Sequence, residues 1–189
     1  MLLYICRLII TSSLMSEEGR KKSISIDDQE LFKLFENFVR RYYYIRYRSY
    51  VVQKRRIKWA TDVEEKHADF LPSLNPDVML ERRDKTLILD TKFYTVQIMS
   101  NHHGKKTTDS NNLYQMYAYV KNKADEKEKD GYDPSGVRGL ILYAKTEDEE
   151  ELDLEYSMRG NKIFVKTLDM NDDWDKIEGR LNSFIDFLC

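Results

Sequence analysis

The chain has 189 residues, of which 41% are hydrophobic, and this length and composition support one domain with a proper core and leave no room for a second large one. Its two cysteines, Cys6 and Cys189, lie near opposite ends, which excludes a disulfide framework and a cysteine metal site and makes a reducing cytoplasm the natural compartment. The formal net charge of −2 excludes a uniformly basic nucleic-acid binder, so the distribution of charge along the chain matters more than its sum.

The first residues are apolar but do not resemble a membrane segment. Residues 1–15 are too short to span a bilayer, and Arg7 interrupts them where a signal peptide would be continuous. We therefore expect residues 1–26 to form a helical lead-in, residues 27–189 to form the domain proper, and the protein not to associate with a membrane.

The next segment predicts the first core helix. Apolar side chains recur there at helical spacing and form a core-facing stripe: Leu31, Leu34, Phe35, Phe38 and Val39. Glu36 borders this stripe. It could reach a functional site beside the helix or could simply be solvated.

Basic and aromatic residues alternate in two segments, residues 40–48 and 54–59, whereas residues 147–155 are strongly acidic. The alternation suits contact with nucleic-acid phosphates together with stacking or packing. The alternative is that the aromatic rings belong to the core and the charges form its solvated edge. We expect both to hold, with the arginines facing the backbone of a nucleic acid, because no base-reading motif is recognisable. The candidate phosphate contacts are Arg40, Arg41, Arg55 and Arg56.

Two apolar runs, residues 75–81 and 85–90, are separated by a short polar segment and predict a β-hairpin. With the turn centred on residues 83–84, Asp77 falls directly opposite Asp90. Side chains of directly opposed residues have Cβ atoms about 4.5–5.5 Å apart. The hairpin therefore brings two carboxylates together.

Alternation along the second strand sends Asp90 and Lys92 to one face and Thr91 to the other. Two adjacent carboxylates repel each other unless a cation lies between them. Magnesium suits such a site, because it binds one or two carboxylates and fills its octahedron with waters and substrate phosphate oxygens. Asp77, Asp90 and Lys92 thus point to metal-dependent hydrolysis of a phosphodiester.

A structural explanation of these three residues is also open. Asp77 could cap a turn, and Asp90 with Lys92 could form an exposed pair at the end of a strand. The apolar residues 87–89 before the pair and 93–94 after it count against this alternative, because they place the pair at the end of a buried strand.

The rest of the chain predicts supporting elements. The polar residues 100–110 predict a mobile flap, in which adjacent His102 and His103 are weak evidence for a metal. The further predicted elements are a helix over residues 109–129, a strand over 137–144, a hairpin over 152–157 and 162–168, and an amphipathic helix over 172–188.

Pro76 and Asp77, followed by Asp90, Thr91 and Lys92, resemble the PD-(D/E)xK nuclease signature. The wider sequence resembles McrC, the nuclease subunit of modification-dependent (5-methylcytosine) restriction systems, in four blocks that keep the order of that family. These blocks are residues 34–39, 70–77, 88–94 and 112–119. The resemblance implies a restriction-endonuclease-like α/β fold, with a mixed central β-sheet flanked by α-helices.

The resemblance also implies roles for individual residues. Asp77 and Asp90 would hold Mg²⁺, for which Mn²⁺ would substitute, and Glu36 matches an acid on the first core helix that often completes such a metal site. Lys92 would position the attacking water. Gln115 and Tyr119, one helical turn apart, resemble a Gln-x-x-x-Tyr element that orients substrate, and plain helix packing is an equally good explanation of them.

The function implied is a magnesium-dependent endonuclease that cuts double-stranded DNA, with no small-molecule substrate. Members of the family engage a GTP-hydrolysing AAA+ partner, McrB, through an N-terminal region that we expect this chain to lack, which leaves partner coupling open. One alternative is a non-catalytic adaptor or assembly subunit of a nucleotide-driven complex. Another is a nuclease with a different role, such as repair or mobile-element defence.

Overall fold

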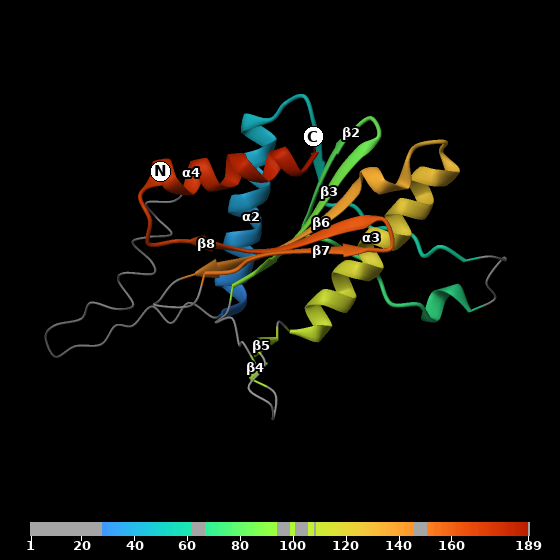
Figure 1. Cartoon of the computed structure of the whole chain (residues 1–189), viewed down its shortest axis with the longest axis horizontal. Coiled ribbons are helices and arrows are strands. Elements are labelled where there is room, and N and C mark those ends of the chain that lie inside the picture. The colour runs from blue at the N-terminus through green and yellow to red at the C-terminus, as the bar shows by residue number, and fades with distance from the viewer. Residues whose placement is uncertain are drawn as a thin grey trace, which may run out of the picture.

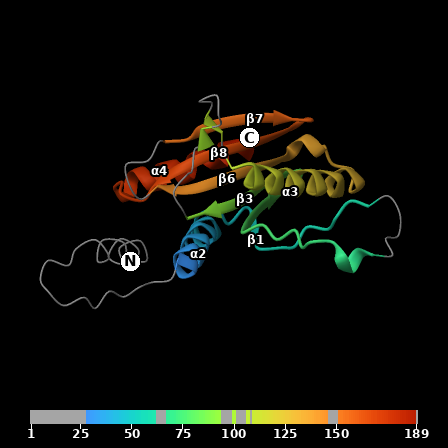
Figure 2. The same cartoon turned by 90° about the horizontal axis from the view of Figure 1, so that it is seen from below.

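The computed structural model describes residues 28–61, 67–93, 99–100, 106–107, 109–145 and 151–188. Its centre is a six-stranded sheet with the strand order β1-β2-β3-β6-β8-β7. These strands are β1 (Val51–Gln53), β2 (Val78–Arg82), β3 (Lys85–Lys92), β6 (Val137–Lys145), β7 (Asp153–Met158) and β8 (Asn161–Asp169). Figures 1 and 2 show α3 against one face of the sheet and α2 and α4 against the other. The predicted α/β fold with a mixed, helix-flanked sheet is therefore confirmed.

Within the described ranges, three α-helices cover the sheet, and short 3-10 turns join or extend the main elements. The helices are α2 (Asp28–Arg46), α3 (Ser110–Lys129) and α4 (Trp174–Ser183). The 3-10 segments are η1 (Ala68–Phe70), η2 (Pro134–Gly136) and η3 (Phe184–Leu188), and a separate two-stranded ribbon consists of β4 (Met99–Ser100) and β5 (Lys106–Thr107). The final helix predicted over residues 172–188 thus begins two residues later and finishes as a 3-10 turn.

The predicted hairpin forms in the expected register. Val78 pairs with Leu89 and Arg82 pairs with Lys85, so residues 83–84 are left as the turn. Beyond the hairpin, β3, β6 and β8 run parallel, whereas β1 and β7 are antiparallel edge strands. The strand β3 therefore lies inside the sheet, with hydrogen-bonded neighbours on both sides.

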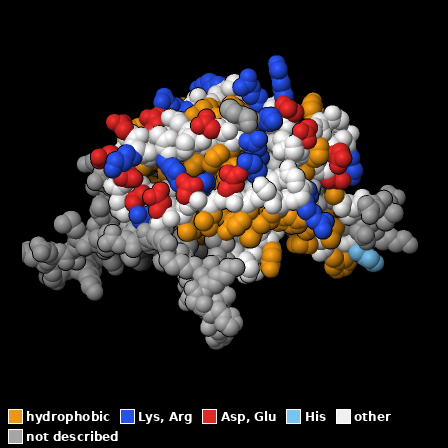
Figure 3. Space-filling view, viewed as in Figure 1, with side chains coloured by type: hydrophobic (Ala, Val, Ile, Leu, Met, Phe, Trp, Pro, Cys, Tyr) orange, Lys and Arg blue, Asp and Glu red, His pale blue; other side chains and the backbone are white. Residues whose placement is uncertain are grey.

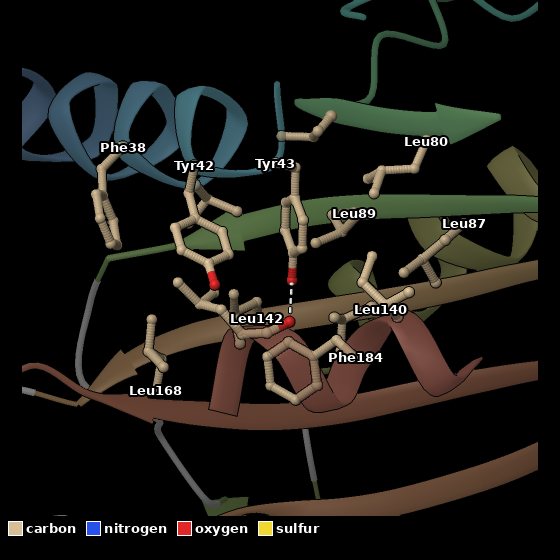
Figure 4. Close-up of a cluster of buried hydrophobic side chains, with 14 of the residues drawn as sticks. Phe38, Tyr42, Tyr43, Leu80, Leu87, Leu89, Leu140, Leu142, Leu168 and Phe184 are labelled. Carbon is tan, nitrogen blue, oxygen red and sulfur yellow. Dashed lines mark hydrogen bonds between the residues drawn. The ribbon is translucent and has the colours of Figure 1, made fainter. Parts of the chain in front are cut away.

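Alternate residues of the central strands enter two separate apolar clusters. Leu87 and Leu89 of β3 face α2, α4 and η3, where they join Leu140, Tyr43 and Phe184 (Figure 4). The residue between them on the strand, at position 88, faces α3 instead. Since both faces of β3 are buried, a polar group near its end is largely removed from solvent, and leaving it without a partner is costly.

The helix α2 buries two of its tyrosines. The Tyr43 hydroxyl, fully buried, donates a hydrogen bond to the carbonyl oxygen of Leu181 at 2.9 Å (Figure 4), and the Tyr42 hydroxyl donates to Asn182 Oδ1 at 2.5 Å. Burial raises the pKa of Tyr42 to about 12. The structure therefore places these two rings in the core against α4, which is one of the two roles expected for the aromatic residues of this segment, whereas Tyr44 is exposed.

Several predictions fall on parts of the chain outside the described residues. These are the helical lead-in over residues 1–26, both cysteines, His102 and His103, and most of the flap predicted over residues 100–110. No helix within the described ranges has the length and apolar character needed to cross a membrane.

The close approach of α3 to β6 depends on Gly139. A Cβ atom at this position would lie 2.6 Å from Met116 Sδ and 2.8 Å from Val120 Cγ2, which is too close for atoms that are not bonded. The helix can therefore approach the sheet only because β6 has no side chain there.

We expect Gly139→Ala to lower the free energy of unfolding by about 1–3 kcal/mol, because the added methyl group forces α3 away from β6. Gly179→Ala is the matched control, since Gly179 lies inside α4 with no atom within 4 Å of the new Cβ. This control should raise the stability by up to about 1 kcal/mol, because alanine favours helix. Urea denaturation followed by circular dichroism measures both, and equal stability of the two variants would contradict the close packing of α3.

Candidate active site

The candidate site lies where β2 begins and β3 ends. Asp77 immediately precedes β2, and Asp90 and Lys92 lie in the last part of β3. The hairpin register places Asp77 beside Asp90, as the sequence predicted. The helices α2 and α3, which cover opposite faces of the sheet, each add side chains to the same place.

Asp90 is the most buried acid of the site, with 4% of its surface exposed. Its Oδ2 atom lies 2.5 Å from Lys92 Nζ, yet it accepts no hydrogen bond of good geometry within the described part of the chain. Burial raises the pKa of Asp90 to about 6, and the negative charges of Asp77 and Glu36 act in the same direction, against the lowering effect of Lys92. The carboxylate therefore sits where additional positive charge would be favourable.

Asp77 is fixed in orientation by Thr91. Its Oδ2 atom accepts one hydrogen bond from the Thr91 backbone nitrogen and one from the Thr91 hydroxyl, both at 2.7 Å. The expectation that Thr91 would point away from the acids was wrong in this respect. Because Asp77 precedes the first residue of β2, strand alternation does not confine its side chain to one face. With Oδ2 occupied, Oδ1 is the oxygen left for other partners.

Glu36 reaches the site from α2 through a lysine. Its Oε1 atom lies 2.8 Å from Lys54 Nζ and 3.5 Å from a guanidinium nitrogen of Arg40. The same lysine nitrogen lies 4.0 Å from Asp77 Oδ1. Lys54 thus stands between the two carboxylates, and Glu36 lies on the border of the site rather than free in solvent.

The helix α3 contributes the predicted pair Gln115 and Tyr119. Gln115 Oε1 accepts a hydrogen bond from Lys92 Nζ at 3.2 Å. The buried Tyr119 hydroxyl donates to the carbonyl oxygen of Asn75 at 3.3 Å, and burial together with the nearby charges of Asp90 and Asp77 raises its pKa well above the usual value. Gln115 contacts the lysine of the site directly, whereas Tyr119 braces the segment that leads into Asp77.

The four arginines proposed as phosphate contacts divide into two groups. Arg40 is paired with Glu36, and Arg55 is paired with Glu126 at 3.0 Å, so both are already engaged within the chain. Arg41 and Arg56 are exposed. On the face shown in Figure 3, basic and acidic side chains are interspersed rather than gathered into one basic surface. Contact of these arginines with DNA stays a prediction.

Sequence reasoning missed two members of the site, Lys54 and Thr91. Lys54 directly follows β1, whose Gln53 pairs with Met79 of β2, and this pairing carries the lysine to the start of β2. A strand of three residues with a partner so distant in sequence leaves no periodic signal. Thr91 belongs to the recognised signature, but its hydroxyl contact depends on the exact position where β2 starts.

Comparisons with known proteins identify relatives of this chain. The family model of the McrBC 5-methylcytosine restriction system component matches residues 1–130. The type IV methyl-directed restriction enzyme EcoKMcrBC of Escherichia coli strain K12 is 22% identical over 186 residues, a match that covers 96% of this chain and 51% of that protein. The chain therefore spans about half the length of this relative.

A solved structure shows a similar fold. It is a half-complex from the tetradecameric assembly of Thermococcus gammatolerans McrB AAA+ hexamers with bound McrC, and one of its chains matches with a TM-score of 0.54 and 17% identity. The match covers 82% of this chain and 33% of the other. The resemblance to McrC seen in the sequence is thereby confirmed, and the chain belongs to the family of McrBC 5-methylcytosine restriction system components.

Proposed function

We propose that the chain is the nuclease subunit of a modification-dependent restriction system and hydrolyses phosphodiester bonds of double-stranded DNA with the help of Mg²⁺. The observation that carries this proposal is the buried Asp90 carboxylate, which lies against Lys92 and beside Asp77 at the end of β3. Two acids and a lysine in this arrangement can hold a metal ion and a polarised water together.

The oxygen donors suit magnesium. Among the described residues, no three carboxylate, imidazole or thiol side chains lie close enough together to enclose a metal ion. The protein would therefore supply the carboxylates of Asp77 and Asp90, and waters and a substrate phosphate would supply the other ligands, as magnesium prefers. The bound ion would lower the pKa of a water and neutralise charge on the phosphate. Mn²⁺ accepts the same donors.

The other residues of the site would orient or hold the groups that take part in the reaction. Lys92, held by Asp90 and by Gln115, presents its ammonium group where it can orient the attacking water or stabilise negative charge on the phosphate. Thr91 keeps Asp77 Oδ1 available by occupying Oδ2 with two hydrogen bonds. Glu36 would assist at the border of the site, from which Lys54 at present separates it.

We infer that the partner is an AAA+ GTPase of the McrB type. The structural neighbour contains McrB AAA+ hexamers with bound McrC, and such a motor would supply the recognition of methylated DNA and its translocation. The competing proposal is a non-catalytic adaptor of the same complex. The joint presence of Asp77, Asp90 and Lys92 in one site argues against it, because an adaptor has no need to bury an acid whose ionisation is disfavoured by burial.

Cleavage of supercoiled plasmid tests the proposed function. The purified chain, alone and with its McrB-type partner, should nick plasmid in the presence of Mg²⁺ or Mn²⁺, and Asp90→Ala or Lys92→Ala should reduce the rate by about 10²–10⁴-fold. Asp175→Ala removes an exposed acid on α4 and serves as the control with unchanged cleavage. Equal cleavage by Asp90→Ala would show a wrongly assigned site, and a folded wild type that never cuts would favour the adaptor.

The raised pKa of Asp90 predicts how stability depends on pH in the metal-free protein. The native state binds this proton more tightly than the unfolded chain does. The favourable contribution is therefore complete below about pH 4 and is lost as the pH rises through about 6. Relative to Asp90→Asn, the wild type should lose on the order of 1–3 kcal/mol of stability between pH 4 and pH 7.5.

Thermal unfolding of both proteins across this pH range measures the difference. Saturating Mg²⁺ should restore the stability of the wild type at pH 7.5 and leave the stability of Asp90→Asn little changed, because the ion stabilises only a protein that binds it. A difference in stability that stays constant with pH would contradict the raised pKa.

A further inference from the structure

Lys54 connects two of the three acids of the site. Its Nζ atom lies 2.8 Å from Glu36 Oε1 and 4.0 Å from Asp77 Oδ1, the oxygen of Asp77 that Thr91 leaves available. The lysine comes from the end of β1 and Glu36 from α2, so their contact crosses from the sheet edge to the covering helix. An ammonium group placed between two carboxylates occupies a position suited to a metal cation.

The charges of the site are balanced without a metal. Three carboxylates, those of Glu36, Asp77 and Asp90, face three cationic side chains, those of Arg40, Lys54 and Lys92. A divalent ion added to this set would meet close positive charges, which repel it strongly at distances of about 4 Å. Binding of the ion therefore favours the departure of one cationic side chain.

The contacts of the three cationic side chains identify which of them can leave the site. Lys92 is held by Asp90 and Gln115, with 15% of its side chain exposed. Arg40 is hydrogen-bonded to Asn37 and touches Glu36 but no other acid of the site. Lys54 has 42% of its side chain exposed and faces Glu36 and Asp77. It can swing into solvent without leaving a buried group unpaired.

We propose that Lys54 is a resident counter-ion that competes with the metal for the Asp77 carboxylate and moves away when the metal binds. This inference rests on the proposed function, since it concerns the same metal site. It makes Lys54 a positioning residue: it keeps two acids of the site close together in the metal-free protein, and its charge limits how tightly the ion is held.

Binding of Mn²⁺ to the full chain without DNA tests the proposal, with free Mn²⁺ measured by electron paramagnetic resonance. Lys54→Ala and Lys54→Met, which remove the charge with and without loss of side-chain length, should each tighten binding by about five- to thirty-fold. Lys54→Arg, which keeps the charge, should bind within about two-fold of the wild type. Circular dichroism confirms that each variant is folded.

Arg55→Ala is the matched control. Arg55 is the next residue, has a similarly exposed side chain and is paired with Glu126 outside the site, so removing its charge should change the affinity less than about two-fold. If Arg55→Ala tightened Mn²⁺ binding as much as Lys54→Ala does, the effect would be a general one of net charge, and the proposal would be overturned. Unchanged or weaker binding in the Lys54→Ala and Lys54→Met variants would overturn it as well.

Asp90→Ala separates this inference from the proposed function. If Asp90→Ala abolishes Mn²⁺ binding while the Lys54 variants bind like the wild type, the metal site stands and the role of Lys54 is overturned. If the wild type and all variants, Asp90→Ala included, bind Mn²⁺ equally weakly, the metal site fails and both proposals fall with it.

Discussion

The burial of β3 on both faces is the constraint on which the rest of the molecule depends. Its alternate side chains enter two apolar clusters, one against α2 and α4 and one against α3, so the strand cannot slide or turn without exposing one of them. Asp90 follows these apolar residues on the same strand and is buried with them. The packing that holds the sheet together thus also carries a carboxylate into a place where its charge is poorly accommodated.

The candidate site is held in place by the fold itself, because its groups are fixed by several different elements. The hairpin sets Asp77 beside Asp90, and Thr91 fixes the orientation of Asp77. The helix α3 holds Lys92 through Gln115, and its distance from the sheet is set at Gly139. The proposed catalysis would depend on rigid neighbours, and here the neighbours are the main elements of the fold.

Local patterns made most of the fold predictable from the sequence. The hairpin register and the helix α3 follow from alternation, a polar turn and helical spacing, all of which act over a few residues. Tertiary packing decided the rest. Tyr42 and Tyr43 looked as suitable for stacking on DNA as for a core, and only the position of α4 distinguishes the two roles. Lys54 reaches the site because it follows β1, a strand of three residues that no local sequence pattern predicts.

The unfavourable ionisation of Asp90 has a consequence for how such proteins diverge. A side chain that stabilises the fold is retained by selection for folding even in a protein that has lost its activity. Asp90 receives no such protection, because an uncharged amide in its place would relieve an electrostatic cost at neutral pH. Under the proposed function, selection for cleavage alone would keep the acid there. In a lineage that no longer needs cleavage, this position would be free to change early, and the fold would persist as a binding subunit.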